Sequence, residues 1–227
     1  METDRIDRSW PFAEGGEPVL SLVSAILAGV IALNVTRPNI FTRILAAIGA
    51  VLWLLVVYFF RDPNRATLEE PGLVVSAADG EVVEIVKELE DTYLRQDMIR
   101  ISVFLSIFDV HVQRFPVSGT VKAVERRSGK FLQAFRSEAS SVNEHIAMVL
   151  ETERGTLLVK QIAGILARRC VNRAHPGDVI RAGERYGMIR FGSRVDLFLP
   201  ADAVVLVGVG DKVAGGISRV AELAEQA

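Results

Sequence analysis

Cysteine and histidine are scarce in this sequence, and its net charge is small. The 227 residues include one cysteine, Cys170, and three histidines, and the formal net charge is −2 at pH 7. A single cysteine excludes an intrachain disulfide, and so few cysteines and histidines argue against a metal site built from them. A chain with so little net charge also lacks the basic surface that nucleic acid binding requires. We therefore expect no metal and no nucleic acid partner.

Charge is missing from two stretches near the N-terminus. Residues 19–35 and 44–60 each form a run of 17 residues without a charged side chain, and residues 36–39 between them are typical of a turn. This length is the lower limit for a helix that crosses a bilayer. We predict that residues 1–63 form a membrane-associating helical hairpin, either spanning or re-entrant. The alternative is a hairpin buried in the core of a soluble protein.

Residues 64–227 have a different texture, in which short β-branched and aliphatic segments alternate with turns rich in Gly, Asp, Asn and Ser. This spacing predicts a sandwich or barrel. Residues 175–189 resemble a turn of lipoyl-like domains, and a similar turn-into-strand pattern occurs at residues 77–83 and 116–121. The predicted fold class is therefore mainly β, a duplicated barrel-sandwich (lipoyl-like) domain preceded by the N-terminal hydrophobic helical hairpin. We expect a short surface helix at residues 217–227.

Gly192-Ser193 is the most distinctive dipeptide of this region. Its flanks, residues 188–189 and 195–199, have a strand-like pattern, and glycine within a strand marks a bulge or a tight bend. At such a bend the Ser193 hydroxyl can attack the Gly192 carbonyl, which converts the amide into an ester. Elimination then breaks the chain and leaves dehydroalanine, which hydrolyses to a pyruvoyl group. The alternative is an ordinary bulge at a sheet edge.

Asp79, Asp109 and His111 are candidates for acid–base chemistry. Asp79 precedes a glycine. Its carboxylate is either catalytic or only hydrogen-bonds the backbone of its own Asp-Gly turn. If the segment around Asp109 and His111 is extended, both side chains lie on one face, where the carboxylate would orient the imidazole as a general base requires. The alternative is a structural histidine. His145 opens a predicted strand and could approach a site, but nothing in the sequence requires it.

Five separated motifs occur in a specific order along the chain. They are Phe59-Phe60-Arg61-Asp62-Pro63, Ala78-Asp79-Gly80, the segment from Phe108-Asp109-Val110-His111 to Gly119, residues 161–169 and residues 187–200. In this order they resemble the short, archaeal-type subfamily of phosphatidylserine decarboxylase proenzymes, over residues 9–210.

This resemblance implies self-cleavage between Gly192 and Ser193, which gives a β chain of residues 1–192 and an α chain of residues 193–227. Ser193 would become a covalent pyruvoyl group, which forms a Schiff base with the substrate amine and accepts the electrons released with carbon dioxide. Phosphatidylserine would be converted to phosphatidylethanolamine. The resemblance also implies that Asp79 and His111 serve serine activation and proton transfer, with Asp109 orienting His111.

The implied partners are phosphatidylserine, membrane lipid and the associated α and β chains of one precursor, at the inner cell membrane. A second copy of the chain, giving a homo-oligomer, is a further candidate partner.

The chain departs from the longer bacterial enzymes of this family at two positions. Their Asp-Tyr-His-Arg-Val-His motif ends in a second histidine where this chain has Arg114, and their Leu-Gly-Ser-Thr reads Phe191-Gly192-Ser193-Arg194 here. Either His111 serves both maturation and turnover, or His145 supplies the second histidine. Two other functions stay open: a non-catalytic, membrane-anchored lipoyl-like binding module, and a self-processing protein that stops after cleavage.

Overall fold

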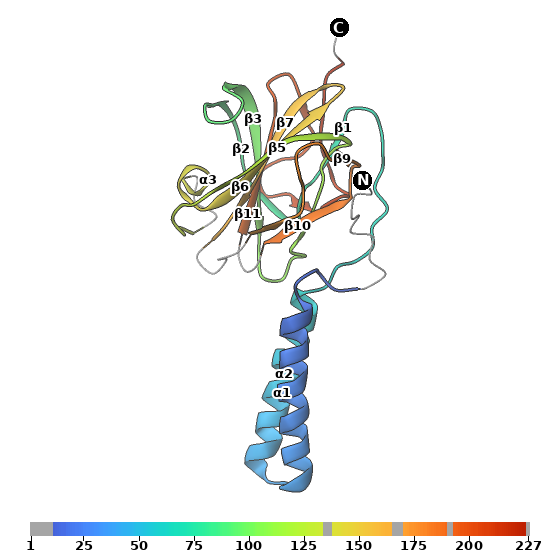
Figure 1. Cartoon of the computed structure of the whole chain (residues 1–227), viewed down its shortest axis with the longest axis vertical. Coiled ribbons are helices and arrows are strands. Elements are labelled where there is room, and N and C mark those ends of the chain that lie inside the picture. The colour runs from blue at the N-terminus through green and yellow to red at the C-terminus, as the bar shows by residue number, and fades with distance from the viewer. Residues whose placement is uncertain (1–10, 134–137, 165–169, 190–192, 226–227) are drawn as a thin grey trace. The chain divides into compact units, whose positions relative to one another are not determined.

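The computed structural model describes residues 11–133, 138–164, 170–189 and 193–225. The chain divides into two compact units, of which one is Arg8–Pro63 and the other includes Asn64–Ala227. The first unit is a helical hairpin and the second is rich in β-strands (Figure 1). This confirms the predicted class, mainly β with an N-terminal helical hairpin. An internal duplication stays a prediction.

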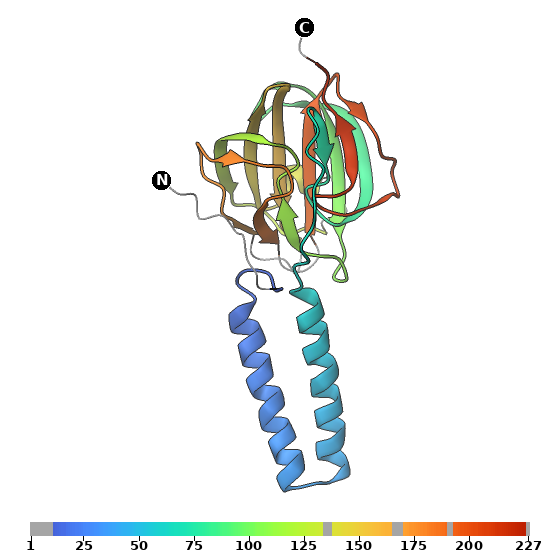
Figure 2. The same ribbon diagram turned by 90° about the vertical axis from the view of Figure 1, so that its right-hand side faces the viewer.

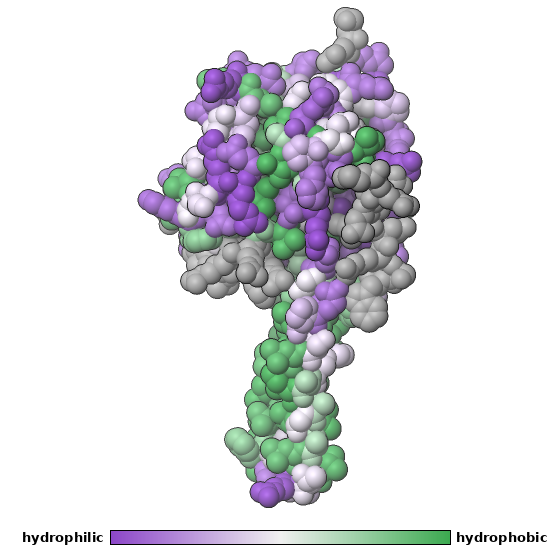
Figure 3. Space-filling view, viewed as in Figure 1, coloured by the Kyte–Doolittle hydropathy of each residue, from purple (hydrophilic) through white to green (hydrophobic). Residues whose placement is uncertain are grey.

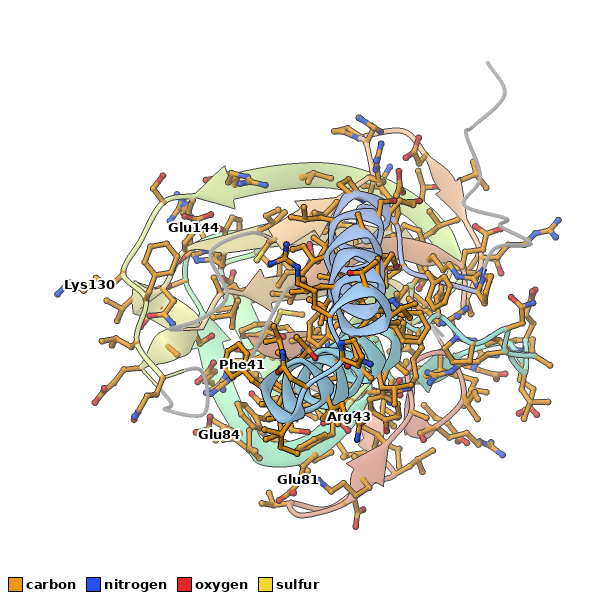
Figure 4. All side chains as sticks on the ribbon, turned by 90° about the horizontal axis from the view of Figure 1, so that it is seen from below. Phe41, Arg43, Glu81, Glu84, Lys130 and Glu144 are labelled. Atoms are coloured by element: carbon orange, nitrogen blue, oxygen red, sulfur yellow. The ribbon has the colours of Figure 1, made fainter. Side chains whose placement is uncertain are left out.

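The hairpin consists of α1 (Glu17–Thr36) and α2 (Ile40–Phe59), which lie side by side in both ribbon views (Figures 1 and 2). Asn39 caps α2, because its side chain accepts a hydrogen bond from the Thr42 amide at 3.0 Å while the Thr42 hydroxyl accepts one from the Asn39 amide. Between the helices, the indole N–H of Trp53 donates to Ser24 Oγ at 2.9 Å. Phe41 and Arg43 lie near the start of α2 (Figure 4).

The hairpin surface is largely hydrophobic (Figure 3). Among the described residues, α1 buries none, and α2 buries only Thr42 and Phe59. Each helix has 20 residues and is long and apolar enough to cross a membrane by length and composition. A helix in the core of a soluble protein would bury its apolar face. The exposure of both helices therefore argues against the buried-hairpin alternative.

Fourteen strands and one short helix make up the described part of the β-rich unit. They are β1 (Leu73–Val75), β2 (Gly80–Glu90), β3 (Gln96–Leu105), β4 (Val112–Arg114), β5 (Gly119–Arg127), α3 (Ala139–Val142), β6 (His145–Thr152), β7 (Gly155–Ile162), β8 (Cys170–Asn172), β9 (Val179–Ile180), β10 (Arg185–Ile189), β11 (Ser193–Pro200), β12 (Val204–Val205), β13 (Lys212–Val213) and β14 (Arg219–Glu222).

These strands form an eight-stranded sheet with the order β13-β2-β3-β11-β7-β6-β5-β9 and two three-stranded sheets, β1-β14-β12 and β4-β10-β8. Strand β11 lies between β3 and β7 and pairs antiparallel with both. Alternate residues of β11, namely Val195, Leu197 and Leu199, join the main hydrophobic core, and their β3 partners do the same. The residues between them point to the reverse face of the sheet.

The expected surface helix at residues 217–227 is wrong. Residues 219–222 form β14, which pairs with β1 and β12. Val220, Ala221 and Leu223 are buried, so tertiary pairing decides the conformation of this segment over its helix-forming alanine and glutamate residues.

Candidate active site

Ser193 is the first residue of β11 and lies opposite Leu105, the last residue of β3. Both residues are completely buried, and the alternation along β11 places the Ser193 side chain on the same face as the core residue Val195. Ser193 Oγ makes no hydrogen bond to any described residue. Because a buried hydroxyl without a partner is costly, this one is a candidate for a chemical role.

Gly192 itself lies outside the described residues, and so does the predicted bulge. The strands on either side of it differ from the expectation that Gly192-Ser193 lies inside one strand. Strand β10 ends at Ile189 in a three-stranded sheet, whereas β11 begins at Ser193 in the eight-stranded sheet. The chain therefore passes from one sheet to the other between Ile189 and Ser193.

His111 lies just before β4 and is completely buried. Its Nδ1 is 2.9 Å from the carbonyl oxygen of Asp109. A carbonyl only accepts hydrogen bonds, so Nδ1 carries the proton, and the neutral ring has its basic lone pair on Nε2. The His111 carbonyl in turn accepts from the Ile189 amide at 3.3 Å, only four residues before Ser193. The backbone of His111 is thus hydrogen-bonded to Ile189, and Ser193 follows Ile189 by four residues.

Buried side-chain amides hold the His111 backbone from a second direction. Gln113 donates to the His111 carbonyl at 2.8 Å, Gln161 donates to Gln113 at 3.0 Å, and Asn172 donates to Gln161 at 2.9 Å. Gln161 lies within one of the five motifs, but nothing in the sequence connects it with Gln113. Three polar residues in strands of otherwise apolar pattern were the only signal for this chain of amides.

Asp109 orients His111 through its main-chain carbonyl. Its carboxylate instead accepts a hydrogen bond from the Ser106 amide at 2.8 Å and closes the turn between β3 and β4. The segment from Ser106 to Asp109 is therefore a turn, not the extended run in which the two side chains would share a face.

Asp79 precedes β2 and is held by Arg65, which sequence analysis did not single out. The Arg65 guanidinium donates to Asp79 Oδ1 at 2.5 Å and to Oδ2 at 2.7 Å, and the Gly215 amide donates to Oδ1 at 2.8 Å. These contacts come from distant parts of the chain, so the carboxylate does more than close its own turn. Residue 65 lies in a segment without regular structure, where no pattern marks it as a partner.

Gly80 explains how Asp79 reaches this end of the sheet. Gly80 has φ +149°, and a Cβ there would lie 2.1 Å from the Phe104 carbonyl oxygen, so only glycine fits. Phe104 precedes Leu105, the partner of Ser193. Asp79 and Ser193 are therefore about two strand spacings apart, on the order of 10 Å between backbones. Asp79 and Ser193 therefore lie at the same end of the eight-stranded sheet, and His111 follows Leu105, the last residue of β3, by six positions.

Arg114, the replacement for the second histidine of the longer enzymes, is buried next to this region. Its amide donates to the Ala77 carbonyl at 2.9 Å, two residues before Asp79, and its Nη1 donates to the Gly183 carbonyl at 3.0 Å. Arg114 therefore joins the loop that carries Asp79 to the loop before β10.

His145 lies on the reverse face of the sheet. It pairs with Ile162, which pairs with Arg194, so its side chain shares a face with Arg194 and not with Ser193. Its Nδ1 is 2.8 Å from the Asn143 carbonyl, and its Nε2 is 2.9 Å from Tyr93 Oη. Burial lowers the pKa of His145 and raises the pKa of Tyr93 to about 12. Both ring nitrogens of His145 therefore have partners on the face of the sheet opposite Ser193.

Cys170 and His175 are two further residues with titratable side chains. Cys170 is buried, burial raises the pKa of its thiol to about 12, and it behaves as a core residue. His175 is largely exposed and lies 3.9 Å from Asp178.

The sequence of the chain is similar to those of known proteins. The family model described as phosphatidylserine decarboxylase matches residues 52–221. A protein of Geotalea uraniireducens named phosphatidylserine decarboxylase proenzyme is 40% identical over 211 residues, which cover 92% of this chain and 95% of the relative. Proteins of the same name from Carboxydothermus hydrogenoformans (44% identical; 76% and 82% covered) and Saccharopolyspora erythraea (47% identical; 78% and 77% covered) are similar. The chain belongs to the phosphatidylserine decarboxylase family.

Proposed function

We propose that this chain is a self-processing decarboxylase that converts phosphatidylserine to phosphatidylethanolamine and carbon dioxide with a pyruvoyl group made from Ser193. The observation that carries the proposal is the buried Ser193 hydroxyl, which has no hydrogen-bond partner among the described residues and faces the core beside the segment anchored on His111. Membership of the family gives the reaction class. The non-catalytic binding module has no observation in its favour.

Maturation begins at Ser193. A base takes the hydroxyl proton, Oγ bonds to the Gly192 carbonyl carbon, and the bond from that carbon to the Ser193 nitrogen breaks as the nitrogen gains a proton. Loss of the Ser193 α-proton then expels the Gly192 carboxylate and leaves dehydroalanine at residue 193. Water hydrolyses its imine tautomer, which releases ammonia and leaves the pyruvoyl group.

His111 is the base that we assign to these proton transfers. Because Nδ1 donates to the Asp109 carbonyl, a neutral His111 can accept a proton only at Nε2. The same nitrogen would then return a proton to the substrate α-carbon after loss of carbon dioxide. One histidine thus serves both maturation and turnover, because His145 is on the other face of the sheet.

Asp79 is the second residue assigned to maturation. Arg65 and the Gly215 amide keep its carboxylate in one orientation at the end of β2. Because the Arg65 guanidinium neutralises much of its charge, we assign to the Asp79 carboxylate a positioning role at the end of the sheet where β11 begins. Asp109 has a supporting role through its carbonyl oxygen.

The pyruvoyl group fits this position because Ser193 is buried, lies next to a histidine-bearing segment and heads a strand that neighbours on both sides hold in place. When present, such a group supplies an electron sink for the carbanion left by loss of carbon dioxide. The residues of the chain bind and orient the substrate, exclude water and move protons at His111 Nε2.

The helical hairpin would place residues 64–227, as the catalytic domain, where the lipid substrate is. Its two exposed apolar helices suit membrane lipid, and we propose the inner cell membrane as the location. The α and β chains would stay associated, since β11 is paired on both sides with strands of the β chain.

Intact-mass analysis of the purified protein, together with a decarboxylation assay, tests this function. We expect a fragment of 35 residues beginning at a pyruvoyl-blocked residue 193, and carbon dioxide release from phosphatidylserine in mixed micelles. An uncleaved chain of 24.9 kDa that does not act on phosphatidylserine would overturn the proposal. Two fragments without decarboxylation would identify a protein that stops after self-cleavage.

A further inference from the structure

A cluster of charged residues and one serine, of which four are buried and two glutamates are partly exposed, lies on the reverse face of the sheet behind Ser193. This reverse-face cluster is formed by Glu84 and Glu88 of β2, Arg100 and Ser102 of β3, and Arg194 and Asp196 of β11. Glu84 is labelled in Figure 4. Nothing in the proposed chemistry uses these residues, although the side chains of Arg194 and Asp196 are completely buried.

Arg194 makes most of its contacts with fixed partners in this cluster. Its Nε donates to Asp196 Oδ1 at 2.5 Å, and its Nη2 donates to Ser102 Oγ at 2.7 Å and to Glu84 Oε2 at 3.1 Å. These partners lie on three neighbouring strands, β11, β3 and β2. The guanidinium therefore joins the beginning of β11 to two strands of the β chain.

Cleavage removes the covalent attachment that holds the beginning of β11. Before cleavage the chain continues from residue 192 into Ser193. Afterwards residue 193 is a chain end, its amide N–H has been lost with the nitrogen, and Arg194 is the first residue that retains one. Free ends of strands fray unless something holds them. Arg194 is the first residue paired with both neighbours, Phe104 on β3 and Ile162 on β7.

The side chain of Arg194 also determines which way residue 193 points. Side chains alternate along a strand, so an Arg194 side chain fixed on the reverse face directs residue 193 toward the core. A twist of the chain end would turn residue 193 away from the core face of the sheet. The contacts of Arg194 resist this twist without occupying any of the space around the reacting group.

Stability alone does not explain such a cluster. Desolvation of buried ion pairs offsets much of their attraction, and well-packed apolar residues often replace them without loss of stability. A guanidinium fork with several fixed acceptors does, however, define one orientation of its strand.

We propose that Arg194 is a positioning residue that holds the new N-terminal end of the α chain after cleavage, so that the pyruvoyl group stays directed toward His111. This inference rests on the proposed function. It assigns to Arg194 a role in turnover by the mature enzyme rather than in self-cleavage, because the intact chain holds residue 193 from both sides.

Arg194→Lys tests the proposal, because lysine keeps the charge but cannot make the forked contacts. The matched control is Arg100→Lys, the same substitution in the same cluster on a strand of the β chain. For each variant we would measure the cleaved fraction and pyruvoyl content by intact mass, decarboxylation of phosphatidylserine per pyruvoyl group, and hydrogen exchange at the amides of residues 195–197.

For Arg194→Lys we expect cleavage close to wild type, turnover per pyruvoyl lower by about 10-fold or more, and faster exchange at residues 195–197. Arg100→Lys should change turnover by less than about 3-fold. Equal losses in the two variants, or a folded but uncleaved Arg194→Lys, would overturn the proposal. Wild-type protein that is neither cleaved nor active would instead refute the proposed function.

If Arg194→Lys does not fold, Asp196→Asn serves as the second variant, since it weakens the strongest contact of Arg194 while keeping the arginine. The same pattern is expected: normal cleavage, reduced turnover per pyruvoyl and faster exchange at the start of the α chain. Wild-type turnover in Asp196→Asn would overturn the proposal.

Discussion

Two buried histidines, one just before β4 and one at the start of β6, have nearly the same local geometry and different surroundings. In each, Nδ1 contacts the carbonyl oxygen two residues earlier, at 2.9 Å for His111 and 2.8 Å for His145. Each ring is thereby held in the tautomer that leaves Nε2 basic. For His145 this nitrogen is 2.9 Å from the hydroxyl of Tyr93, whose raised pKa keeps its proton in place.

Tertiary placement, not local sequence, separates these two histidines. The backbone of His111 is bound to Ile189, which leads to Ser193, whereas His145 shares a face with Arg194 and lies near Lys160. In the proposed function, His111 and not His145 is the catalytic base because the His111 backbone is hydrogen-bonded to the segment that leads to Ser193.

Loss of Ser193 should have the largest effect. In Ser193→Ala no hydroxyl is present to attack the Gly192 carbonyl, so we expect one uncleaved, inactive chain of 24.9 kDa by intact mass. The matched control is Ser140→Ala, which removes another buried serine, on α3, and should leave cleavage complete. Cleavage that persists in Ser193→Ala would refute the assigned site.

His111→Gln and His145→Gln form the direct test of the comparison. Without the base at His111, we expect both maturation and decarboxylation to slow by about 10²- to 10⁴-fold. His145→Gln should change both rates by less than about 3-fold, since glutamine still offers a polar group to Tyr93. The measurements are the rate of appearance of the 35-residue fragment and turnover per pyruvoyl. Similar losses of cleavage and turnover in both variants would show that the different placement of the two histidines does not decide which one is catalytic.

Much of the fold could be predicted from the sequence because its signals are local. The charge-free runs predicted both helices, and the alternation of short aliphatic segments with turns predicted the strand-rich unit. The tail at residues 217–227 was misread because its composition favours a helix while β1 and β12 provide pairing partners. Pairing between distant strands leaves no periodic signal in one segment.

The candidate site was predictable in its residue types but not in its connections. Asp79, His111 and Ser193 stand in short motifs, whereas Arg65 and the amides of Gln113 and Gln161 act across 14 to 150 positions of sequence. The role of Asp109 was also hidden, because its carbonyl and not its carboxylate meets the ring. Whether the carbonyl or the carboxylate of Asp109 contacts the His111 ring depends on the turn at residues 106–109, which the sequence alone does not define.

Asp79→Asn should have an intermediate effect. The change leaves the Arg65 guanidinium, whose side chain is only 8% exposed, without its carboxylate partner. We expect the stability to fall by about 3 kcal/mol and cleavage to slow by about 10- to 100-fold. Chemical unfolding and the rate of fragment formation measure the two effects.

The control for Asp79→Asn is Asp178→Asn, in another turn, where the carboxylate accepts from the His175 amide at 2.8 Å. This variant should be cleaved at the wild-type rate. If Asp79→Asn is also cleaved at that rate, Asp79 has only a structural role and the site reduces to Ser193 and His111.

The smallest effect concerns how stability depends on pH at His145. Burial lowers its pKa below the value of about 6.5 in the unfolded chain, and nearby Lys160 and Arg127 act in the same direction, against Glu125 and the Asn143 carbonyl. Below that pH the unfolded chain binds a proton that the folded protein does not, so wild type loses stability as the pH falls from 7.5 to 5.5. His145→Gln lacks this titration, and its melting temperature should fall less over the same interval. An equal fall in both proteins would mean that His145 is protonated in the folded state, which would contradict its neutral contact with Tyr93.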